Sequence, residues 1–247
     1  MRLHVVSDLH LEFGPCDLPK VDADCMILAG DIHVKKNGLQ WIRAAYSEIP
    51  VVYVLGNHEF YGEKFPNLAD KLQEEAAGRN IHVLENRYVE IAGMRIFGCT
   101  LWTDMALHGD SYIGSIEARQ MNDYKRIRHS ATYRKLLPND TRVHHAHSIV
   151  CLKNFLQSGD PRRSLIVTHH APSPLSLPQH RRSELISCAY ASHLEDLIRA
   201  YSPLVWVHGH IHQSQNYTIG STLVIANPRG YADEANVNFI PDYVTDA

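Results

Sequence analysis

Five short apolar runs in the sequence each end abruptly in polar residues. The runs are LHVV, CMILA, VVYVL, SLIV and LVWV, and the residues that follow them are SDLH, GDIH, GNHE, THHAP and HGHIH. Runs of this length that are apolar on both faces are typical of strands buried inside an α/β domain. Because the loops beyond the carboxyl ends of parallel neighbouring strands share one crevice, we expect the five polar ends to meet there.

Between these runs lie stretches with helical and hairpin patterns. Apolar residues three or four positions apart predict helices over 38–48, 65–78 and 192–201. The alternating segment 81–102 breaks at Ala92 and Gly93, which predicts a hairpin, and 221–231 predicts one more strand and a turn. Such β-α-β stretches combined with hairpins predict an α/β fold with more than one sheet, covered by helices.

The length of 247 residues is expected to form a single domain over 1–247. Within it, 103–160 is the least regular part, and we expect it to be an insertion that shapes the substrate pocket. The formal net charge of −3 gives no general argument for a polyanionic partner, so nucleic acid is possible but not favoured.

The sequence also indicates the cellular compartment in which we expect the protein. No stretch approaches the roughly 18 apolar residues of a membrane span, and Asp8 interrupts the first apolar run before the core of a signal peptide could form. The five cysteines include no CxxC pair, which fits reduced thiols better than a disulfide framework. We therefore expect a cytoplasmic protein that does not contact a membrane.

The polar ends of the five runs carry an unusual set of metal-binding side chains. The set comprises Asp8, His10, Asp31, Asn57, His58, His169, His170, His210 and His212. Imidazole suits Zn, Fe or Ni, whereas carboxylate and carbonyl oxygens suit Mn and similar harder ions. These ligands are too many for one tetrahedral ion but suit two ions that share a carboxylate. Two-metal sites commonly serve displacement at phosphorus, in which a hydroxide held by both ions attacks in line.

Single members of this set also have simpler explanations. Asp8 alone could cap a helix, Asp31 alone suits a Gly-Asp turn, and His169 or His170 alone could be a hydrogen-bonded core histidine. The GHIH sequence at 209–212 is the strongest single piece. Because all the pieces occur in order and each follows a predicted strand, the metal site is the better explanation.

The order D8-L9-H10, G30-D31, G56-N57-H58-E59, T168-H169-H170 and G209-H210-I211-H212 resembles the calcineurin-like metallophosphoesterase superfamily. Other stretches, including NPRGY at 227–231, look like those of small bacterial members. The resemblance implies a four-layer αββα sandwich of two mixed β-sheets flanked by helices. It also implies a dinuclear metal site at the carboxyl ends of the strands.

The resemblance further implies a role for each matching residue. Asp8, His10 and His212 would bind the first ion, Asp31 would bridge, and Asn57, His169 and His210 would bind the second. His58 would bind no metal and would act in catalysis with Asp31, by stabilising the transition state or protonating the leaving oxygen. Candidate substrate-binding residues are Asn57, His170 and Arg229. Arg229 could hold a phosphate bidentately, although a turn arginine paired with a carboxylate is the favoured alternative.

The sequence departs from the family pattern after Gly30-Asp31. The continuation GDIHVKKNG argues against the protein Ser/Thr phosphatase branch, which carries GD-x-x-D-R-G. A carboxylate partner for His58 therefore stays open, because the adjacency of Glu59 in sequence does not place its side chain. His33 could line the site, but a surface position is favoured.

The three histidines of the last motif, VHGHIH, are predicted to have different roles. In a strand, His210 and His212 would leave on the same side with Cβ atoms roughly 7 Å apart, which suits one imidazole for each of two ions. Gly209 would let the backbone turn close to the site. His208 is expected to pack within the strand end, with donation to a ligand as the alternative.

These observations predict a two-metal hydrolase of phosphate monoesters or diesters with a metal-bridging hydroxide as nucleophile. A nuclease on DNA or RNA with the same site is the alternative, and a non-catalytic scaffold ranks last because no expected ligand is missing. Mn is the favoured metal, with Fe, Zn, Co or Ni open. The sequence leaves the substrate and the oligomeric state open.

Overall fold

The five apolar runs form buried strands, but they divide between two sheets. The computed structural model describes residues 1–46 and 48–247. One sheet contains three of the runs as parallel strands: β1 (Arg2–Val6), β2 (Cys25–Ala29) and β3 (Val51–Val54). The other sheet contains the remaining two, β9 (Ser164–Thr168) and β10 (Val205–His208), also parallel. The expectation that the polar ends share one crevice therefore depends on how the two sheets pack.

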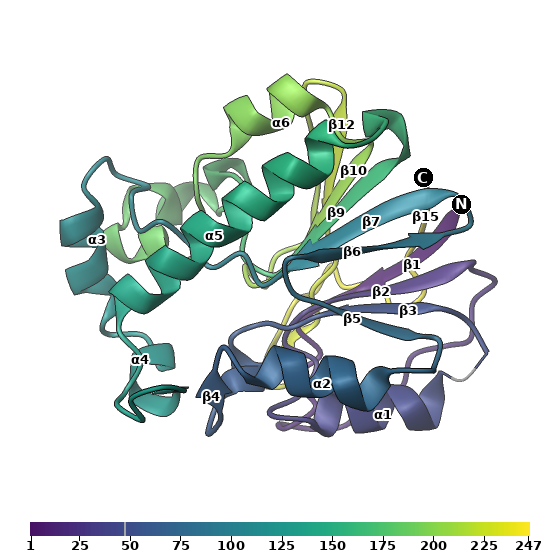
Figure 1. Cartoon of the computed structure of the whole chain (residues 1–247), viewed down its shortest axis with the longest axis horizontal. Coiled ribbons are helices and arrows are strands. Elements are labelled where there is room, and N and C mark those ends of the chain that lie inside the picture. The colour runs from purple at the N-terminus through teal and green to yellow at the C-terminus, as the bar shows by residue number, and fades with distance from the viewer. Residues whose placement is uncertain (47) are drawn as a thin grey trace.

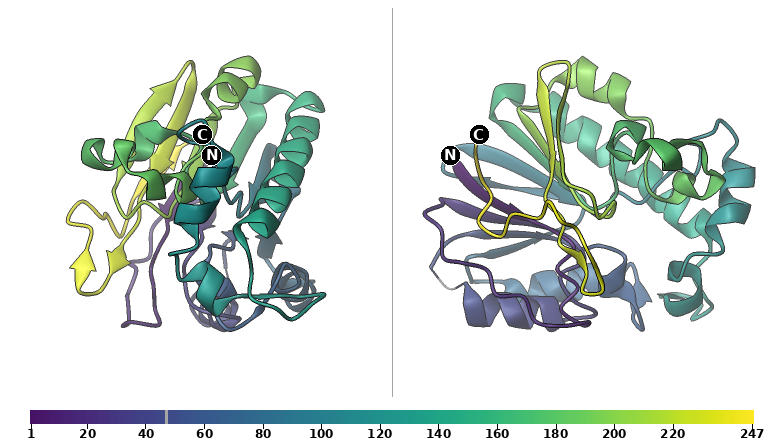
Figure 2. Two further views of the ribbon diagram at one scale, coloured as in Figure 1. Left: turned by 90° about the vertical axis from the view of Figure 1, so that its left-hand side faces the viewer. Right: turned by 180° about the vertical axis from the view of Figure 1, so that it is seen from behind.

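The first sheet has the strand order β15-β1-β2-β3-β5. Here β5 (Ile81–Leu84) runs parallel to β3, and β15 (Val244–Asp246) runs antiparallel to β1. The β15–β1 pairing brings the two ends of the chain together, and the backbone amide of Ala247 donates to the Met1 carbonyl at 2.9 Å. Both termini lie on the same side of the molecule in Figure 2.

The second sheet has the order β11-β12-β10-β9-β7-β6. Its further strands are β6 (Arg87–Ile91), β7 (Met94–Cys99), β11 (Gln215–Ile219) and β12 (Thr222–Ala226). The hairpin predicted at Ala92 and Gly93 joins β6 to β7. Residues 81–84 do not belong to it, because the chain passes from one sheet to the other at Glu85 and Asn86. The hairpin partner of β12, β11, was not predicted because most of its residues are partly exposed and polar.

Helices cover the outer face of each sheet, which makes a four-layer αββα sandwich (Figure 1). The helices α1 (Asn37–Ala45) and α2 (Leu68–Ala76) lie on the first sheet, and α5 (Pro138–Gln157) and α6 (Glu195–Tyr201) lie on the second. The middle layer contains apolar side chains from both sheets, including Ile27, Val52, Val167 and Val207. This architecture is the one that the family resemblance implied.

The predicted helices are present with shifted ends. The helix expected over 38–48 spans Asn37–Ala45, and its predicted end includes Ser47, which lies outside the described residues. The helix expected over 65–78 begins at Leu68, after Pro66, and the one expected over 192–201 begins at Glu195. No helix in the described part of the chain is long and apolar enough to cross a membrane.

The segment 103–160 contains both regular and irregular structure. Its last third is α5, a helix of 20 residues that buries Leu152 and Phe155 against the second sheet. The preceding part contains α3 (Ser111–Ala118), α4 (Asp123–Arg126) and the short strand β8 (Arg128–His129), which pairs with β4 (Lys64–Phe65). In Figure 1, α3 and α4 lie beyond the ends of the sheets, on the side to which β9 and β10 point.

Several short elements complete the described chain. They are the 3₁₀ helices η1 (His58–Phe60), η2 (Pro161–Arg163), η3 (Pro174–Ser176), η4 (Gln179–Ser183) and η5 (Leu185–Ala189), and the two-residue strands β13 (Gly230–Tyr231) and β14 (Glu234–Ala235).

Candidate active site

The loops that follow β1, β2, β3, β9 and β10 meet at one end of the sandwich. The amide of His210 donates to Asp8 Oδ1 at 3.0 Å, and His169 Nδ1 donates to the Ala29 carbonyl at 2.9 Å. Both bonds cross from one sheet to the other. They bring the ligand candidates of the first sheet against those of the second, so the predicted convergence occurs across the sandwich rather than along one sheet.

Unusual backbone conformations aim these side chains inward. Asp8, His10, Asp31, His210 and His212 all have φ between 46° and 68°. Non-glycine residues with positive φ are uncommon and concentrate at functional sites. Here all five left-handed residues are ligand candidates, and they lie in the loops that follow β1, β2 and β10.

The same observation changes the explanation for His210 and His212. The strand β10 ends at His208, and both later histidines are left-handed, so their separation does not come from an extended strand. Gly209 has the role predicted for it, because a Cβ there would lie 2.6 Å from Asp8 Oδ2 and 2.8 Å from the Ala29 carbonyl. The close approach of the two sheets at this point requires glycine.

The candidate ligands form three overlapping groups. They are Asp8, His10 and His212; His10, Asp31 and His58; and Asp31, His169 and His210. Within each group the possible donor atoms lie within 4.8 Å of one another. Asp31 belongs to two groups, and its Oδ2 lies 3.8 Å from His10 Nε2 and 3.5 Å from His169 Nε2. A carboxylate between two sets of imidazoles is the arrangement that two neighbouring divalent ions require.

Individual contacts support the fit of cations to this site. His10 Nε2 and His212 Nε2 lie 3.0 Å apart, and Asn57 Oδ1 lies 3.0 Å from His169 Nε2. The Nε2 atom of His210 is buried and has no hydrogen-bond partner among the described residues. Converging acceptor atoms and an unpartnered buried imidazole nitrogen are costly without a cation to bind.

The electrostatics of the site agree with this interpretation. Burial raises the pKa of Asp31, but the imidazoles of His169, His58 and His10 outweigh burial and hold the pKa well below its usual range. Burial lowers the pKa of His169, but Asp31 and Asp8 raise it to about 10. The carboxylates thus stay ionised and draw positive charge, which divalent ions would supply in place of protons.

Glu59 is a structural residue of the site and not the partner of His58. Its fully buried carboxylate accepts hydrogen bonds from the amides of Asp31 and Ile32, at 3.0 and 2.7 Å, and from the amide of Gly56 at 2.7 Å. The Tyr53 hydroxyl donates to it as well, at 2.8 Å. Glu59 therefore joins the Gly-Asp loop to the Gly-Asn-His-Glu loop.

The carboxylate partner of His58 is Glu12, which the sequence did not reveal. Glu12 Oε1 lies 2.7 Å from His58 Nδ1 and 3.3 Å from His10 Nδ1. Burial lowers the pKa of His58, but the charges of Asp31 and Glu12 raise it to about 8. The carboxylate holds the proton on Nδ1 and directs Nε2 toward Asp31, at 4.0 Å.

Asp123 and Tyr61 orient Asn57. The Asn57 amide nitrogen donates to Asp123 Oδ1 at 2.8 Å and to the Tyr61 hydroxyl at 3.2 Å, and that hydroxyl donates to the same Asp123 oxygen at 2.7 Å. These bonds occupy the nitrogen end of the amide, so the oxygen end faces His169. Asp123 opens α4, inside the segment 103–160, and no motif marked it.

Two predicted substrate-binding residues lie elsewhere than expected. The Arg229 guanidinium donates to the carbonyls of Leu9, Gly14 and Pro15, at 2.8 to 3.3 Å, and so fixes the loop after β1. Among the described residues it pairs with no carboxylate, and it does not line the cavity over the site. His170 is buried, and its Nδ1 donates to the Thr100 carbonyl at 3.1 Å. Its ring packs on that of His210, with centroids 4.2 Å apart, so it helps to fix the position of this ligand candidate.

The other two histidines that the sequence singled out are also placed. His208 is fully buried, and its ring bonds Ser176 Oγ and the Gly209 carbonyl, as a residue packed within the strand end. His33 is partly exposed, with Nδ1 accepting from the Val34 amide and lying 3.8 Å from Glu12 Oε2.

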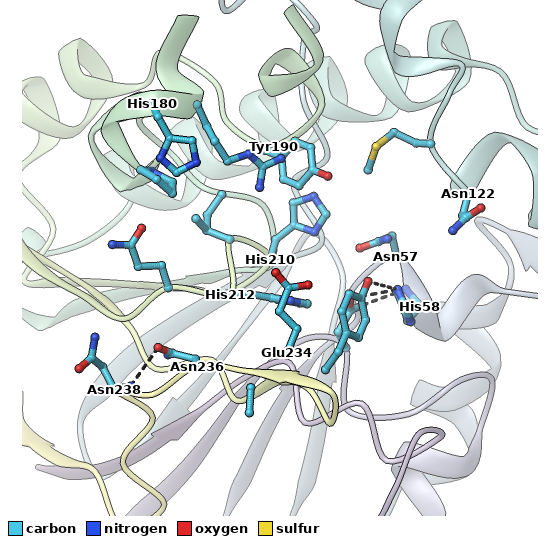
Figure 3. Close-up of a pocket in the computed structure, with 18 of the residues that line it drawn as sticks. Asn57, His58, Asn122, His180, Tyr190, His210, His212, Glu234, Asn236 and Asn238 are labelled. Carbon is cyan, nitrogen blue, oxygen red and sulfur yellow. Dashed lines mark hydrogen bonds and ion pairs between the residues drawn. The ribbon is translucent and has the colours of Figure 1, made fainter. Parts of the chain in front are cut away.

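A cavity of about 1130 Å³ opens over the candidate ligands (Figure 3). Asp31, Asn57, His58, His210 and His212 form its floor. Its walls include residues 120–122, 125, 178–181 and 234–238. Seven lining residues carry carboxamides, and the cationic side chains Lys125 and Arg181 face the same space as Glu234. This volume is far larger than a phosphate needs, so the cavity can also hold the organic part of an ester.

Comparison with known proteins agrees with the geometry. The model of the calcineurin-like phosphoesterases matches residues 1–214. The chain belongs to the calcineurin-like phosphoesterase family. It is accordingly a phosphoric ester hydrolase whose histidine and aspartate groups form a dinuclear divalent metal site.

One solved structure shows the same fold at low sequence identity, and a second gives a weaker match. The phosphopantetheinyl hydrolase of Mycobacterium tuberculosis is 17% identical over 94% of this chain and 90% of its own, with a TM-score of 0.72. A putative 5'-nucleotidase from Staphylococcus aureus is 16% identical over 93% of this chain and 48% of its own, with a TM-score of 0.48. No curated protein matches the sequence.

Proposed function

We propose that this phosphoesterase hydrolyses small phosphate esters with two divalent ions, and that Mn is its first choice of metal. The observation that carries the proposal is the sharing of Asp31 between two groups of imidazoles. Mixed imidazole and oxygen donors suit Mn, Fe, Zn, Co and Ni, and the harder oxygen ligands favour Mn. The proposed ligands of the first ion are Asp8, His10, Asp31 and His212, and those of the second are Asp31, Asn57, His169 and His210.

The chain supplies the remaining chemistry. When bound, the two ions contribute positive charge at the phosphate and a hydroxide nucleophile near neutral pH. His58 Nε2 faces the cavity beside Asp31 and carries the proton for the leaving oxygen, while Glu12 holds Nδ1. Asn57 keeps its carbonyl oxygen toward the ions because Asp123 accepts from its nitrogen.

Among esters, the cavity favours a phosphodiester with polar groups on both sides of the phosphorus. In Figure 3, His210 and His58 lie between Asn122 on one side and His180 and Asn238 on the other. A phosphate seated on the floor therefore has space in two directions, whereas a monoester needs only one. Carboxamide walls suit hydroxyl- or amide-bearing groups better than apolar ones. The Mycobacterium tuberculosis protein with a similar fold is named a phosphopantetheinyl hydrolase, which makes phosphopantetheinyl esters a reasonable probe.

The test compares bis-p-nitrophenyl phosphate with p-nitrophenyl phosphate on protein loaded with Mn, Fe, Zn, Co or Ni in turn. We expect turnover of the diester with a higher kcat/KM than the monoester, and loss of both activities in Asp31→Ala. Absence of turnover on either ester with every metal would contradict the proposal. Cleavage of single-stranded oligonucleotides at low salt, in preference to both esters, would favour a nuclease instead.

A further inference from the structure

The NPRGY sequence at 227–231 builds one wall of the site. Asn227 is buried, and its side chain bonds the Val5 and Ile240 carbonyls, which fixes the chain as it leaves β12. The backbone amides of Arg229 and Gly230 then donate to the carbonyls of Ser7 and Asp8, at 3.0 and 3.1 Å. These bonds attach the segment to the loop that carries Asp8 and His10. The residue that follows, Tyr231, is thereby held at a fixed place.

Tyr231 lies over the floor of the cavity. Its ring centroid is 4.5 Å from that of His10, 4.6 Å from that of His212 and 5.9 Å from that of His58. Its hydroxyl lies 3.4 Å from His58 Nε2, the nitrogen that faces the cavity. Tyr231 thus combines a ring packed on ligand candidates with a hydroxyl directed to the place where a phosphate would sit.

The hydroxyl is available for a substrate. Its contact with His58 is long for a hydrogen bond in which oxygen takes part, and it makes no other hydrogen bond among the described residues. His58 does not depend on this contact for its orientation, because Glu12 holds Nδ1 at 2.7 Å. A phosphate oxygen entering beside His58 would therefore meet an uncommitted O–H donor.

We propose that Tyr231 is a catalytic residue whose hydroxyl donates a hydrogen bond to a phosphate oxygen of the bound ester. The inference rests on the proposed function and adds a second donor beside His58. The Tyr231 proton stays on its oxygen, and the proton that reaches the leaving group comes from His58 Nε2. A donor fixed before binding stabilises charge that develops on phosphate oxygens without reorganisation.

The variant that tests this is Tyr231→Phe, which keeps the ring and removes the hydroxyl. In Mn-loaded protein, we expect kcat/KM on bis-p-nitrophenyl phosphate to fall about 10- to 100-fold, the loss expected for a hydrogen bond to a charged group. We also expect weaker binding of inorganic phosphate, measured by calorimetry, with unchanged metal content. The matched control is Tyr88→Phe, because Tyr88 is 52% exposed on β6, away from this cavity.

Two readouts separate this inference from the proposed function. If wild-type protein turns over the ester and Tyr231→Phe equals it in kcat/KM and phosphate binding, the inference is wrong and the function stands. If no protein turns over any ester, the proposed function fails. In that case the Tyr231–His58 contact is still tested in metal-free protein by the ¹⁵N NMR shift of His58 Nε2. A shift that is identical in Tyr231→Phe would overturn the contact itself.

Discussion

Single side chains that are distant in sequence position the reactive residues of the site. Glu12 lies 46 residues before His58 and is the carboxylate partner of that imidazole. The stretch GDIHVKKNG contains no carboxylate after Asp31 that could take this role. We expect Glu12→Gln to lower kcat about 10- to 100-fold, because the imidazole loses the charge that orients it. Glu12 lies outside the proposed ligand set, so metal content measured by elemental analysis should not change. Glu74→Gln, on the exposed face of α2, is the control. A loss of bound metal in Glu12→Gln would mean that Glu12 acts on the first ion, directly or through His10, whose Nδ1 lies 3.3 Å from it.

Asp123 should act on the second ion through Asn57. Without this carboxylate the Asn57 amide can rotate, and its nitrogen can face the ions in place of its oxygen. We expect Asp123→Ala to weaken binding of one of two Mn ions about 10- to 100-fold, as for other residues that orient a ligand. Titration with Mn, followed by metal analysis of the separated protein, measures this. Asp196→Ala, exposed on α6, should bind both ions as wild type does, and equal affinity in Asp123→Ala would refute the role.

The sequence predicted the proposed ligands but not the residues that orient them. Asp8, His10 and His212 stand in short motifs at strand ends, and the order of these motifs along the chain indicates a metal site. Glu12, Asp123 and Tyr231 carry no such spacing, because their roles arise only from contacts across 46, 66 and 173 residues of sequence. Arg229 shows the reverse limitation. Its motif suggested a phosphate ligand, but three backbone carbonyls occupy its guanidinium.

At the scale of elements, the sequence predicted the buried apolar strands well. It predicted polar or short elements poorly. The run CMILA is buried at every residue, so its pattern was unambiguous. The edge strands β11 and β15 are short or half exposed, and their pairing depends on neighbours that the local sequence does not specify. The helix α5 lies in the segment expected to be irregular, because polar residues such as His145 and Ser148 occupy part of its buried face.

The contact of α5 with the turn between β5 and β6 predicts a pH dependence of stability. Glu85 is buried there, where Thr100 donates to one carboxylate oxygen and His144 of α5 lies 3.8 Å from the other. Burial raises the pKa of Glu85 to about 7 from its ordinary value of 4.5. The unfolded chain releases this proton first, so the contribution of Glu85 to stability is lost as pH rises from 4.5 through 7. The loss is about 3 kcal/mol at most.

Burial acts on His144 in the opposite sense, since it lowers the pKa of that residue to about 4. The two effects therefore oppose each other in the wild-type protein, and a comparison of variants is needed to separate them. Urea unfolding of wild type and Glu85→Gln at pH 5 and pH 8 isolates Glu85, because His144 is common to both. Wild type should lose stability relative to Glu85→Gln at the higher pH. A difference that is the same at both pH values would show that Glu85 is ionised throughout.

At the scale of the whole molecule, the site joins the two sheets. The first sheet contributes Asp8, His10, Asp31 and Asn57, and the second contributes His169, His210 and His212, so bound ions would hold the two halves together. Because the unfolded chain has no such site, each ion at 100 times its Kd should add about 2.7 kcal/mol to the free energy of unfolding. Removal of metal with a chelator should lower the urea midpoint accordingly.

The variant Asp31→Asn separates this effect from nonspecific binding. It keeps the size of the side chain but removes the charge shared by the two groups of imidazoles, so its urea midpoint should respond far less to Mn than that of wild type. In chelator it should be less stable than wild type, because the imidazoles of His169, His58 and His10 lose the carboxylate charge that attracts them. Asp196→Asn should gain as much from Mn as wild type. If Asp31→Asn gained equally, the ions would be stabilising the fold from some other place than the junction of the two sheets.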